Sequence, residues 1–199
     1  LNSTDYYGIH TKRAAQNFDT AGHPVHMDLI HSMVLVKKAC AKANVQVKQL
    51  NPQLGNAIVE ACDIILTGAY DAYFITDALQ GGAGTSTNMN VNEVIANVAL
   101  EQLGHDKGNY DILHPLNHVN MSQSTNDVYP TALRIAAIRK VRLLADALAS
   151  LQESLQEKEN TFSTVLKLGR TQLMDALPVT MGQEFGAYAR AISRDRWRI

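Results

Sequence analysis

The chain has 199 residues, of which 46% are hydrophobic and 19% charged, so it is long enough to bury a core and too apolar to be disordered. The 18 basic and 19 acidic residues leave a formal net charge of −1, which provides no basic surface for nucleic acid or an anionic membrane. The sequence has neither an apolar run of membrane-spanning length nor the pattern of a signal peptide, and we therefore expect a globular, cytoplasmic protein.

Helices separated by glycine and proline account for the first half of the chain. Residues 1–27 are irregular, and apolar residues at steps of three and four predict the helices that follow. Asn90 and Glu93 have the spacing of a capping box, so the third helix is expected to begin near Asn90. A loop is expected from 105 to 118. The predicted helices span residues 28–50, 51–79 and about 90–104.

A long helix is predicted after Asn126-Asp127, with Pro130 tolerated in its first turn, and it continues to about residue 160. A heptad seam needs partner helices, which a monomeric bundle and an oligomer supply equally well. A further helix begins near Thr180, where Gln183 completes a capping box. Short strands are expected only near the N-terminus and near residues 164–168. The predicted seam consists of Ala137, Val141, Leu144, Leu148, Leu151 and Leu155.

Three stretches rich in Ser, Thr, Asn, Gln and Gly run directly into predicted helices: Gly81–Asn92, Val119–Thr131 and Gly169–Phe185. A helix N-terminus presents free backbone N–H groups and a partial positive charge, so three such ends that converge would bind a small anion with neutral donors. Such donors stabilise the enediolate that forms when a proton is removed beside a carboxylate. This pattern favours a small metabolite with several carboxylates over a polymer, although the first stretch alone fits a flexible linker equally well.

The same three stretches, in this order, resemble hallmark segments of the aspartase/fumarase superfamily of lyases. The matching segments are GTSTNMNVNEVIAN, HVNMSQSTNDVYPTALRI and GRTQLMDALPVTMGQEF, and the opening YYGIHTKRAAQNF is similar as well. The resemblance implies a mainly α fold, with an N-terminal helical domain over residues 1–123 and the first long helices of a central bundle over residues 124–199. It also implies that the chain corresponds to the front part of a family member.

Within the superfamily, small differences favour the aspartate ammonia-lyases over the class II fumarases. The chain reads GAGT, SQSTND and GRTQLMDA where class II fumarases usually read GSGT, SQSSND and GRTHLQDA. Gln172 stands where fumarases often have a histidine, as some aspartases also do, and an amide binds but does not shuttle a proton. The resemblance therefore implies reversible elimination of ammonia from L-aspartate to give fumarate, with class II fumarase as the alternative.

By position, the resemblance assigns substrate contacts and supporting roles to residues of the three stretches. Thr85, Ser124, Thr125 and Asn126 match contacts to the β-carboxylate and amino group, Thr171 an α-carboxylate contact, and Gln172 a neighbour of the amino group. The supporting residues are Ser86, Asn88, Asp127 and Arg170; Asp127 is expected to cap a helix or hold neighbours, and Arg170 to clamp a carboxylate or pair with an acid. His114 matches a histidine of a secondary anion site in fumarases, but Leu116 replaces a polar residue there.

The resemblance also implies what the 199 residues lack. The family's general base is a serine on a mobile GSSxMPxKxN-type loop, and no such segment occurs here, so the base is expected to lie beyond Ile199. We therefore expect no catalytic base within these 199 residues and no activity from them alone. The helical pattern of the last residues, which continues to Ile199 without a cap or breaker, agrees with this expectation.

The family's members are homotetramers whose sites draw on three subunits, so a homo-oligomer that acts on L-aspartate and fumarate is expected. The reaction requires no cofactor, and activation by a divalent cation stays open. No HxxxH or CxxC spacing predicts a metal site, and Cys40 and Cys62 are expected to be buried free thiols. A non-catalytic helical assembly module remains a further alternative.

Overall fold

The computed structural model describes residues 4–80 and 82–199 and is mainly helical, which confirms the predicted fold class. The chain forms two compact units, residues 1–136 and 137–199, and each is described separately. The division between the units falls inside the long helix α5 (Thr125–Thr161). The domain boundary expected at residue 123 stays a prediction. Within the described residues, no helix is both long and apolar enough to cross a membrane.

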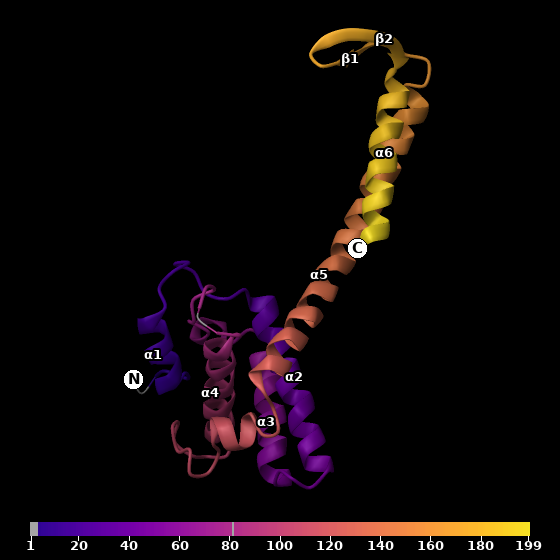
Figure 1. Ribbon diagram of the computed structural model, residues 1–199. Helices are drawn as coiled ribbons and strands as arrows, with labels where there is room; N and C mark the ends of the chain where they lie inside the picture. The colour runs from indigo at the N-terminus through magenta and orange to yellow at the C-terminus, as the bar shows by residue number, and fades with distance from the viewer. Residues whose placement is uncertain (1–3, 81) are drawn as a thin grey trace. The chain divides into compact units, whose positions relative to one another are not determined.

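Helix α4 (Thr85–Gln102) is the centre of the first unit and contacts the three helices that precede it (Figure 1). Every residue from Thr87 to Leu100 is buried, so the helix is enclosed on all sides and its polar residues must find partners inside the protein. The three helices packed around it are α1 (Ile9–Asn17), α2 (Met27–Gln46) and α3 (Pro52–Ile65).

The second predicted helix is shorter than its apolar pattern indicated. Helix α3 ends at Ile65, and the predicted continuation to Leu79 is wrong. Gly68 adopts a left-handed φ of 89°, which ends the helix, and only the short 3-10 helix η1 (Asp71–Tyr73) follows. The apolar residues after Ile65 instead pack as irregular chain against the core; Phe74, for example, is 3% exposed.

Helix α4 begins at Thr85, five residues before the predicted start, so the expected capping box of Asn90 and Glu93 is wrong. Both side chains lie in the interior of the helix and bind other segments. The Asn90 side chain accepts from the N–H of Ile75 and donates to the carbonyl of Tyr73. Glu93 accepts from the N–H groups of Gly8, His10 and Thr11 at the start of α1 and from the Thr11 hydroxyl.

Helix α5 begins at Thr125 and spans 37 residues, which confirms the long helix predicted up to about residue 160. Pro130 lies in its second turn rather than its first, where the missing N–H leaves the Asn126 carbonyl without its intrahelical donor. The loop expected from 105 to 118 is mostly irregular, but it ends in a π-helical turn, η2 (Pro115–Val119). That turn contacts α4.

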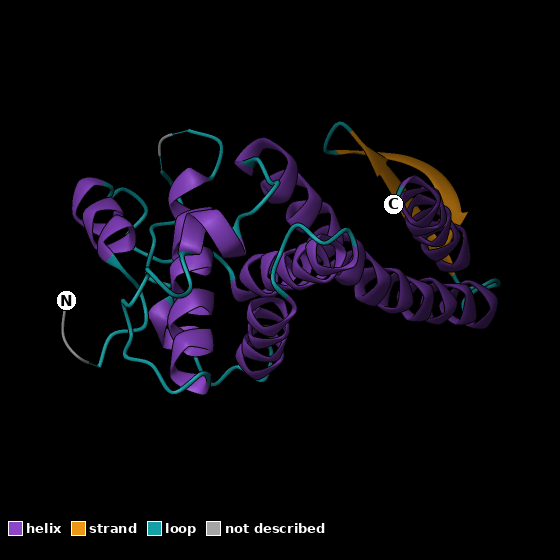
Figure 2. Ribbon diagram, turned by 90° about the horizontal axis from the view of Figure 1, so that it is seen from below, coloured by secondary structure: helices purple, strands orange, loops and turns teal. Residues whose placement is uncertain are grey.

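The second unit consists of the C-terminal part of α5, an antiparallel hairpin and helix α6 (Met181–Arg198), which lies beside α5 (Figures 1 and 2). The hairpin joins β1 (Leu166–Thr171) to β2 (Met174–Thr180) and is longer than the short strand expected near 164–168. The capping box of Thr180 and Gln183 is confirmed. Near the N-terminus the expected strand is reduced to an isolated bridge between Pro24 and Asp77.

The seam predicted on α5 separates into two rows. Val141, Leu148 and Leu155 are half-buried, whereas Ala137, Leu144 and Leu151 are exposed. Stacking of Phe162 on Phe185, at 5.7 Å between ring centroids, and a hydrogen bond of 2.9 Å from Arg196 to Gln152 hold α6 against the end of α5. Helix α6 is thus one partner helix that the seam required.

The helical pattern expected up to the last residue stops one position earlier. Helix α6 ends at Arg198, and Ile199 follows it as the C-terminal cap residue with 49% of its surface exposed. The last turn carries the basic side chains of Arg196 and Arg198, which the helix dipole favours at this end.

Candidate functional site

Two of the three polar stretches meet in the first unit. The turn that leads into α4 and the first two turns of α5 line a pocket of about 330 Å³, so the starts of two helices border one cavity. The first stretch contributes residues of the glycine-rich turn, and the second contributes the first turns of α5. The lining residues are Ala78, Gln80, Gly82, Ala83, Gly84, Asn126, Tyr129 and Pro130.

Gly84 is the point of closest approach between the two stretches. It precedes α4 with a left-handed φ of 83°, and a Cβ at this position would stand 2.1 Å from Cδ2 of Tyr129 on α5. Both the backbone conformation and the contact with the aromatic ring therefore require glycine. This packing explains the glycine at position 84, which a flexible linker would not need.

The start of α4 is held by Gln80, which the sequence reasoning missed. Its Oε1 accepts from the N–H of Thr87 at 3.0 Å, and its Nε2 donates to the Thr87 hydroxyl at 2.7 Å and to the Asp77 carbonyl at 2.8 Å. Burial raises the pKa of the Asp77 carboxyl, but the N–H groups of Leu79, Gly22, Ala21 and Thr20 outweigh that effect and lower it. The turn before α4 is therefore fixed by a charged carboxylate and an amide.

Asn88 and Thr125 link the two stretches directly. Asn88 is 2% exposed and its Nδ2 donates to Oγ1 of Thr125 at 3.0 Å. A hydroxyl that accepts from one side has its own proton free to donate elsewhere. Asn88 therefore orients Thr125 as a hydrogen-bond donor at the start of α5.

The remaining predicted residues of these two stretches surround the same helix ends. Thr85 is exposed and Ser86 half-buried in the first turn of α4. Ser124 is exposed and caps α5, since its Oγ accepts from the N–H of Asn126 at 3.2 Å. Asn126 lines the pocket, and Asp127 is exposed in the first turn of α5, where a carboxylate is favoured by the helix dipole.

The third polar stretch forms most of the hairpin of the second unit and the first turn of α6. Arg170 and Thr171 end β1, and Gln172 and Leu173 form the turn with φ of 50° and 64°. All four side chains are exposed, and the Arg170 guanidinium lies 3.8 Å from a carboxylate oxygen of Asp175 across the hairpin. The structural pairing expected for Arg170 is thus present, in a solvent-exposed and therefore weak form.

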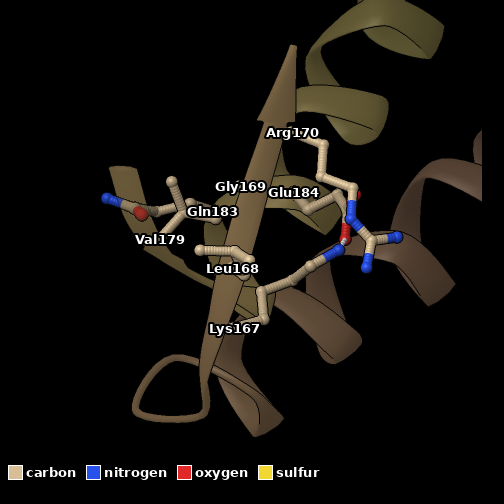
Figure 3. A pocket seen from close by; sticks show the side chains of 7 residues that line it. All are labelled: Lys167, Leu168, Gly169, Arg170, Val179, Gln183 and Glu184. Atoms are coloured by element: carbon tan, nitrogen blue, oxygen red, sulfur yellow. Dashed lines mark hydrogen bonds and ion pairs between the residues drawn. The ribbon is translucent and has the colours of Figure 1, made fainter. Parts of the chain in front are cut away.

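A second pocket, of about 680 Å³, lies beside β1 within the second unit (Figure 3). Lys167 donates to Glu184 of α6 at 2.7 Å, and the side chain of Arg170 extends towards the same carboxylate. A register shift between Leu168 and Arg170 brings Lys167 and Arg170 to one side of the strand. Lys167 thus pairs with Glu184, whereas the recorded ion pair of Arg170 is the one with Asp175 across the hairpin.

His114 has a capping role in the structure. Its Nδ1 accepts from the N–H groups of Leu116 and Asn117 at the start of η2, at 3.0 and 3.3 Å. The backbone N–H of His114 donates to Nδ1 of His118. Burial, together with the charge of His114, lowers the pKa of His118. Of the His114 ring, Nε2 remains for an anion, so the secondary anion site stays a prediction.

Lys37 and Asn120 of the first unit were not identified from the sequence. Lys37 on α2 is fully buried, and its Nζ donates to Oδ1 of Asn120 at 2.7 Å. Burial lowers the pKa of Lys37 to about 7. The helical spacing of α2 does carry a signal, because Lys37 lies three positions after buried Val34 and four before buried Ala41. Among the described residues, no group of three or more His, Cys, Asp or Glu side chains has an arrangement that would hold a metal ion.

The general base that the resemblance implies is a serine beyond Ile199. Ile199 follows α6 at the end of the second unit, so the expected serine loop lies outside residues 4–80 and 82–199, which the structure describes. The position and identity of the base stay a prediction. What the described residues supply is hydroxyl and amide side chains at the starts of α4 and α5.

Comparison with known proteins supports the resemblance seen in the motifs. A family model described as lyase matches residues 2–199. The aspartate ammonia-lyase of Bacillus subtilis is 50% identical over 194 residues, which cover 98% of this chain and 41% of that protein. The chain thus spans well under half the length of the relatives it matches.

Solved structures agree with the sequence relatives. A protein described as fumarate lyase:delta crystallin from Brucella melitensis is 47% identical with a TM-score of 0.94, and the match covers 100% of this chain and 45% of that one. The class II fumarase of Schistosoma mansoni is 32% identical with a TM-score of 0.91, over 98% of this chain and 42% of that one. The chain therefore belongs to the aspartase/fumarase superfamily of lyases.

Proposed function

We propose that the natural protein carrying this chain is an aspartate ammonia-lyase, which reversibly eliminates ammonia from L-aspartate to give fumarate. The relatives of 48–50% identity that bear this name support the proposal, as do the motif differences from class II fumarases. The exposed amide of Gln172, where fumarases often carry an imidazole, favours binding of an amino group over proton transfer.

The observation that carries the proposal is the set of hydroxyl and amide side chains at the starts of α4 and α5, where Asn126 lines the pocket. Oγ1 of Thr125 accepts from Asn88, which leaves the hydroxyl proton of Thr125 available for a substrate carboxylate. Thr85 lies at the start of α4, and Ser124 and Asn126 lie at the start of α5. Loss of the proton next to the substrate carboxylate would place two negative charges on that group. Neutral donors held in advance stabilise this charge more than that of the ground state, which is what acceleration requires.

We assign to this chain the recognition of the carboxylates and the stabilisation of the enediolate, with Thr171 and Gln172 contributing from the hairpin. We further propose that the natural protein is a cytoplasmic homotetramer whose sites combine residues of three subunits, which would let the hairpin of one chain serve the pocket of another. The general base belongs to a serine loop beyond Ile199, so the 199 residues alone should not convert L-aspartate to fumarate.

The test uses the natural protein and the 199-residue chain side by side. The natural protein is expected to form fumarate from L-aspartate, which ultraviolet absorbance follows. The chain alone is expected to form fumarate from neither L-aspartate nor L-malate. Faster turnover of L-malate than of L-aspartate would instead identify a class II fumarase. Turnover of L-aspartate by the isolated chain would contradict the assignment of the base to another segment.

Substitution of Thr125 separates catalysis from a purely structural module. Thr125→Ala in the natural protein should lower kcat by about 100-fold, because one preorganised donor to the enediolate is lost. Thr125→Ser keeps the hydroxyl and should retain most activity. Thr131→Ala on the same helix, whose hydroxyl donates only to the Asp127 carbonyl, is the matched control. Equal rates in all three variants would favour the assembly module.

A further inference from the structure

The buried ammonium of Lys37 has no role in the recognition of substrate described above. Lysine is among the residue types least often buried, yet this side chain is fully enclosed on α2. No ion pair of Lys37 is recorded within residues 4–80 and 82–199; its recorded hydrogen bonds run to Oδ1 of Asn120 at 2.7 Å and Oε1 of Gln123 at 2.9 Å. An amine that is buried at the cost of its desolvation requires an explanation beyond filling space.

Both acceptors belong to the turn that leads into α5. Asn120 and Gln123 bind each other's backbone or that of their neighbours: Nδ2 of Asn120 donates to the Gln123 carbonyl, and Nε2 of Gln123 donates to the carbonyls of Val119 and Met121. Ser122 between them adopts a left-handed φ of 58°, which is unfavourable for serine. The turn therefore depends on side-chain hydrogen bonds for its shape.

Hydrogen bonds connect this turn to Thr125, one of the residues expected to bind substrate. Oδ1 of Asn120 accepts from the ammonium of Lys37 and from the side-chain amides of Asn88 at 3.1 Å and Asn92 at 3.2 Å. The same Nδ2 of Asn88 donates to Oγ1 of Thr125. Nζ of Lys37 is the nearest of the three donors, and while it is protonated its hydrogen bond is charge-assisted and about twice as strong as a neutral one.

We propose that Lys37 is a positioning residue of the site: its ammonium fixes Asn120 and Gln123, and through Asn120 and Asn88 it sets the position of Thr125. The catalytic part of this inference rests on the proposed function, whereas the structural part concerns the turn alone. If Lys37 merely filled the core, its replacement would destabilise the whole unit. Residues 120–128 would then lose no more protection against hydrogen exchange than α4.

Amide hydrogen exchange on the 199-residue chain tests the structural part. Lys37→Met is apolar and of similar length, but it leaves Oε1 of Gln123 without its recorded donor and Oδ1 of Asn120 without the nearest of its three donors. The amides of Gln123, Asp127 and Val128 should therefore exchange about ten- to hundredfold faster. The amides of Val94–Leu100 should keep their rates. Lys38→Met is the control, because the neighbouring Lys38 pairs with Asp63 at the surface. Unchanged exchange at 123–128, or equal acceleration in α4, would overturn the proposal.

A measurement on the unaltered chain tests the same coupling if the Lys37→Met variant does not fold. The 13C resonance of Lys37 Cε and the side-chain amide resonances of Asn120 and Gln123 should follow one common titration in the unaltered chain. Cys40 of α2 and Cys62 of α3 are the thiols whose charge acts on Lys37, and burial raises the pKa of both, so they titrate at higher pH. Amide resonances that ignore the titration of Lys37 would contradict the proposed coupling.

Kinetics of the natural protein test the catalytic part. Folded Lys37→Met enzyme should show kcat for L-aspartate lowered at least tenfold, with Lys37→Arg recovering part of the loss and Lys38→Met unchanged. A purely structural role predicts less folded enzyme with normal kcat and KM, and that result would overturn the positioning role. Failure of the unaltered natural protein to turn over L-aspartate would refute the proposed function instead, and the exchange experiment would still decide the structural part.

Discussion

At the scale of single residues, the site depends on positions where the backbone or a buried charge allows only one side chain. Gly84 and Lys37 are the clearest examples. Gly84 lies where α4 meets Tyr129, and Lys37 lies under the turn that leads to Thr125. Neither contacts the substrate in the proposed reaction, yet each constrains residues that do.

Gly84→Ala should destabilise the first unit by about 3 kcal/mol, because the left-handed conformation costs about 1–2 kcal/mol and overpacking against Tyr129 costs a similar amount. Gly104→Ala is the matched control, since Gly104 has a similar φ of 78° and nothing within 4 Å of a new Cβ. Urea denaturation followed by circular dichroism measures both variants. Equal losses would show that the Tyr129 contact contributes nothing.

Stability should rise with pH between about 7 and 8.5, because Lys37 has a folded pKa of about 7 and a reference value of 10.5. In this window the unfolded chain binds more protons than the folded one, so raising the pH favours the folded state. The raised pKa of the two thiols acts in the opposite direction only near and above their reference value of 9.0.

Denaturation at several pH values checks this dependence. Lys37→Met should flatten the rise, whereas Lys38→Met should keep it, because Lys38 sits in a surface pair with Asp63. A rise of equal slope in Lys37→Met would assign the titration to another group.

At the scale of elements, the caps of the helices and the turn of the hairpin follow local chemistry to different degrees. Thr180 and Gln183 form the capping box that their spacing predicts. The hairpin turn does the opposite: Gln172 and Leu173 occupy left-handed conformations that favour Asn or Gly. Strain at a turn that the resemblance places at the substrate agrees with a functional constraint on these two residues.

Leu173→Gly should stabilise the hairpin by about 1 kcal/mol, because glycine removes the left-handed strain and the lost side chain is fully exposed. Met174→Gly, one residue later in β2, is the control and should weaken the strand, since its backbone is extended. Cross-strand nuclear Overhauser effects and their loss on heating report the population of the hairpin. A less populated hairpin in Leu173→Gly would contradict the strain argument.

At the scale of the whole molecule, the second unit exposes apolar side chains that a folded chain normally covers. Leu144 is 47% and Leu151 is 45% exposed along one row of the α5 seam. Exposed apolar rows of this kind mark surfaces of association, and a second copy of the chain is the partner implied by the proposed tetramer.

The 199-residue chain should therefore self-associate, and the double substitution Leu144→Glu/Leu151→Glu should weaken the association by placing charges on the row. Gln156→Glu, which adds a charge at an exposed polar position of the same helix, is the control. Multi-angle light scattering over a concentration series gives the mass. A constant mass of 21.8 kDa for the unaltered chain would refute the prediction.

The sequence by itself determined the features that depend on neighbouring residues. The long α5, the box that caps α6, the helical class and the three polar motifs all follow from periodicity and from side chains within four positions of one another. Since such contacts form inside one segment, they are visible without the fold. The motifs also sufficed to recognise the family, and the family match confirmed that recognition.

Only the tertiary structure decided which polar residues serve the core and which serve the site. Local spacing places Glu93 in a helix cap, but its carboxylate binds the start of α1 across 82 to 85 positions of sequence. Lys37 reaches Asn120 across 83 positions, and residues after Ile65 leave the helix to pack against the core. Buried polar groups must find partners wherever the fold brings donors and acceptors together, and that choice is not encoded in local spacing.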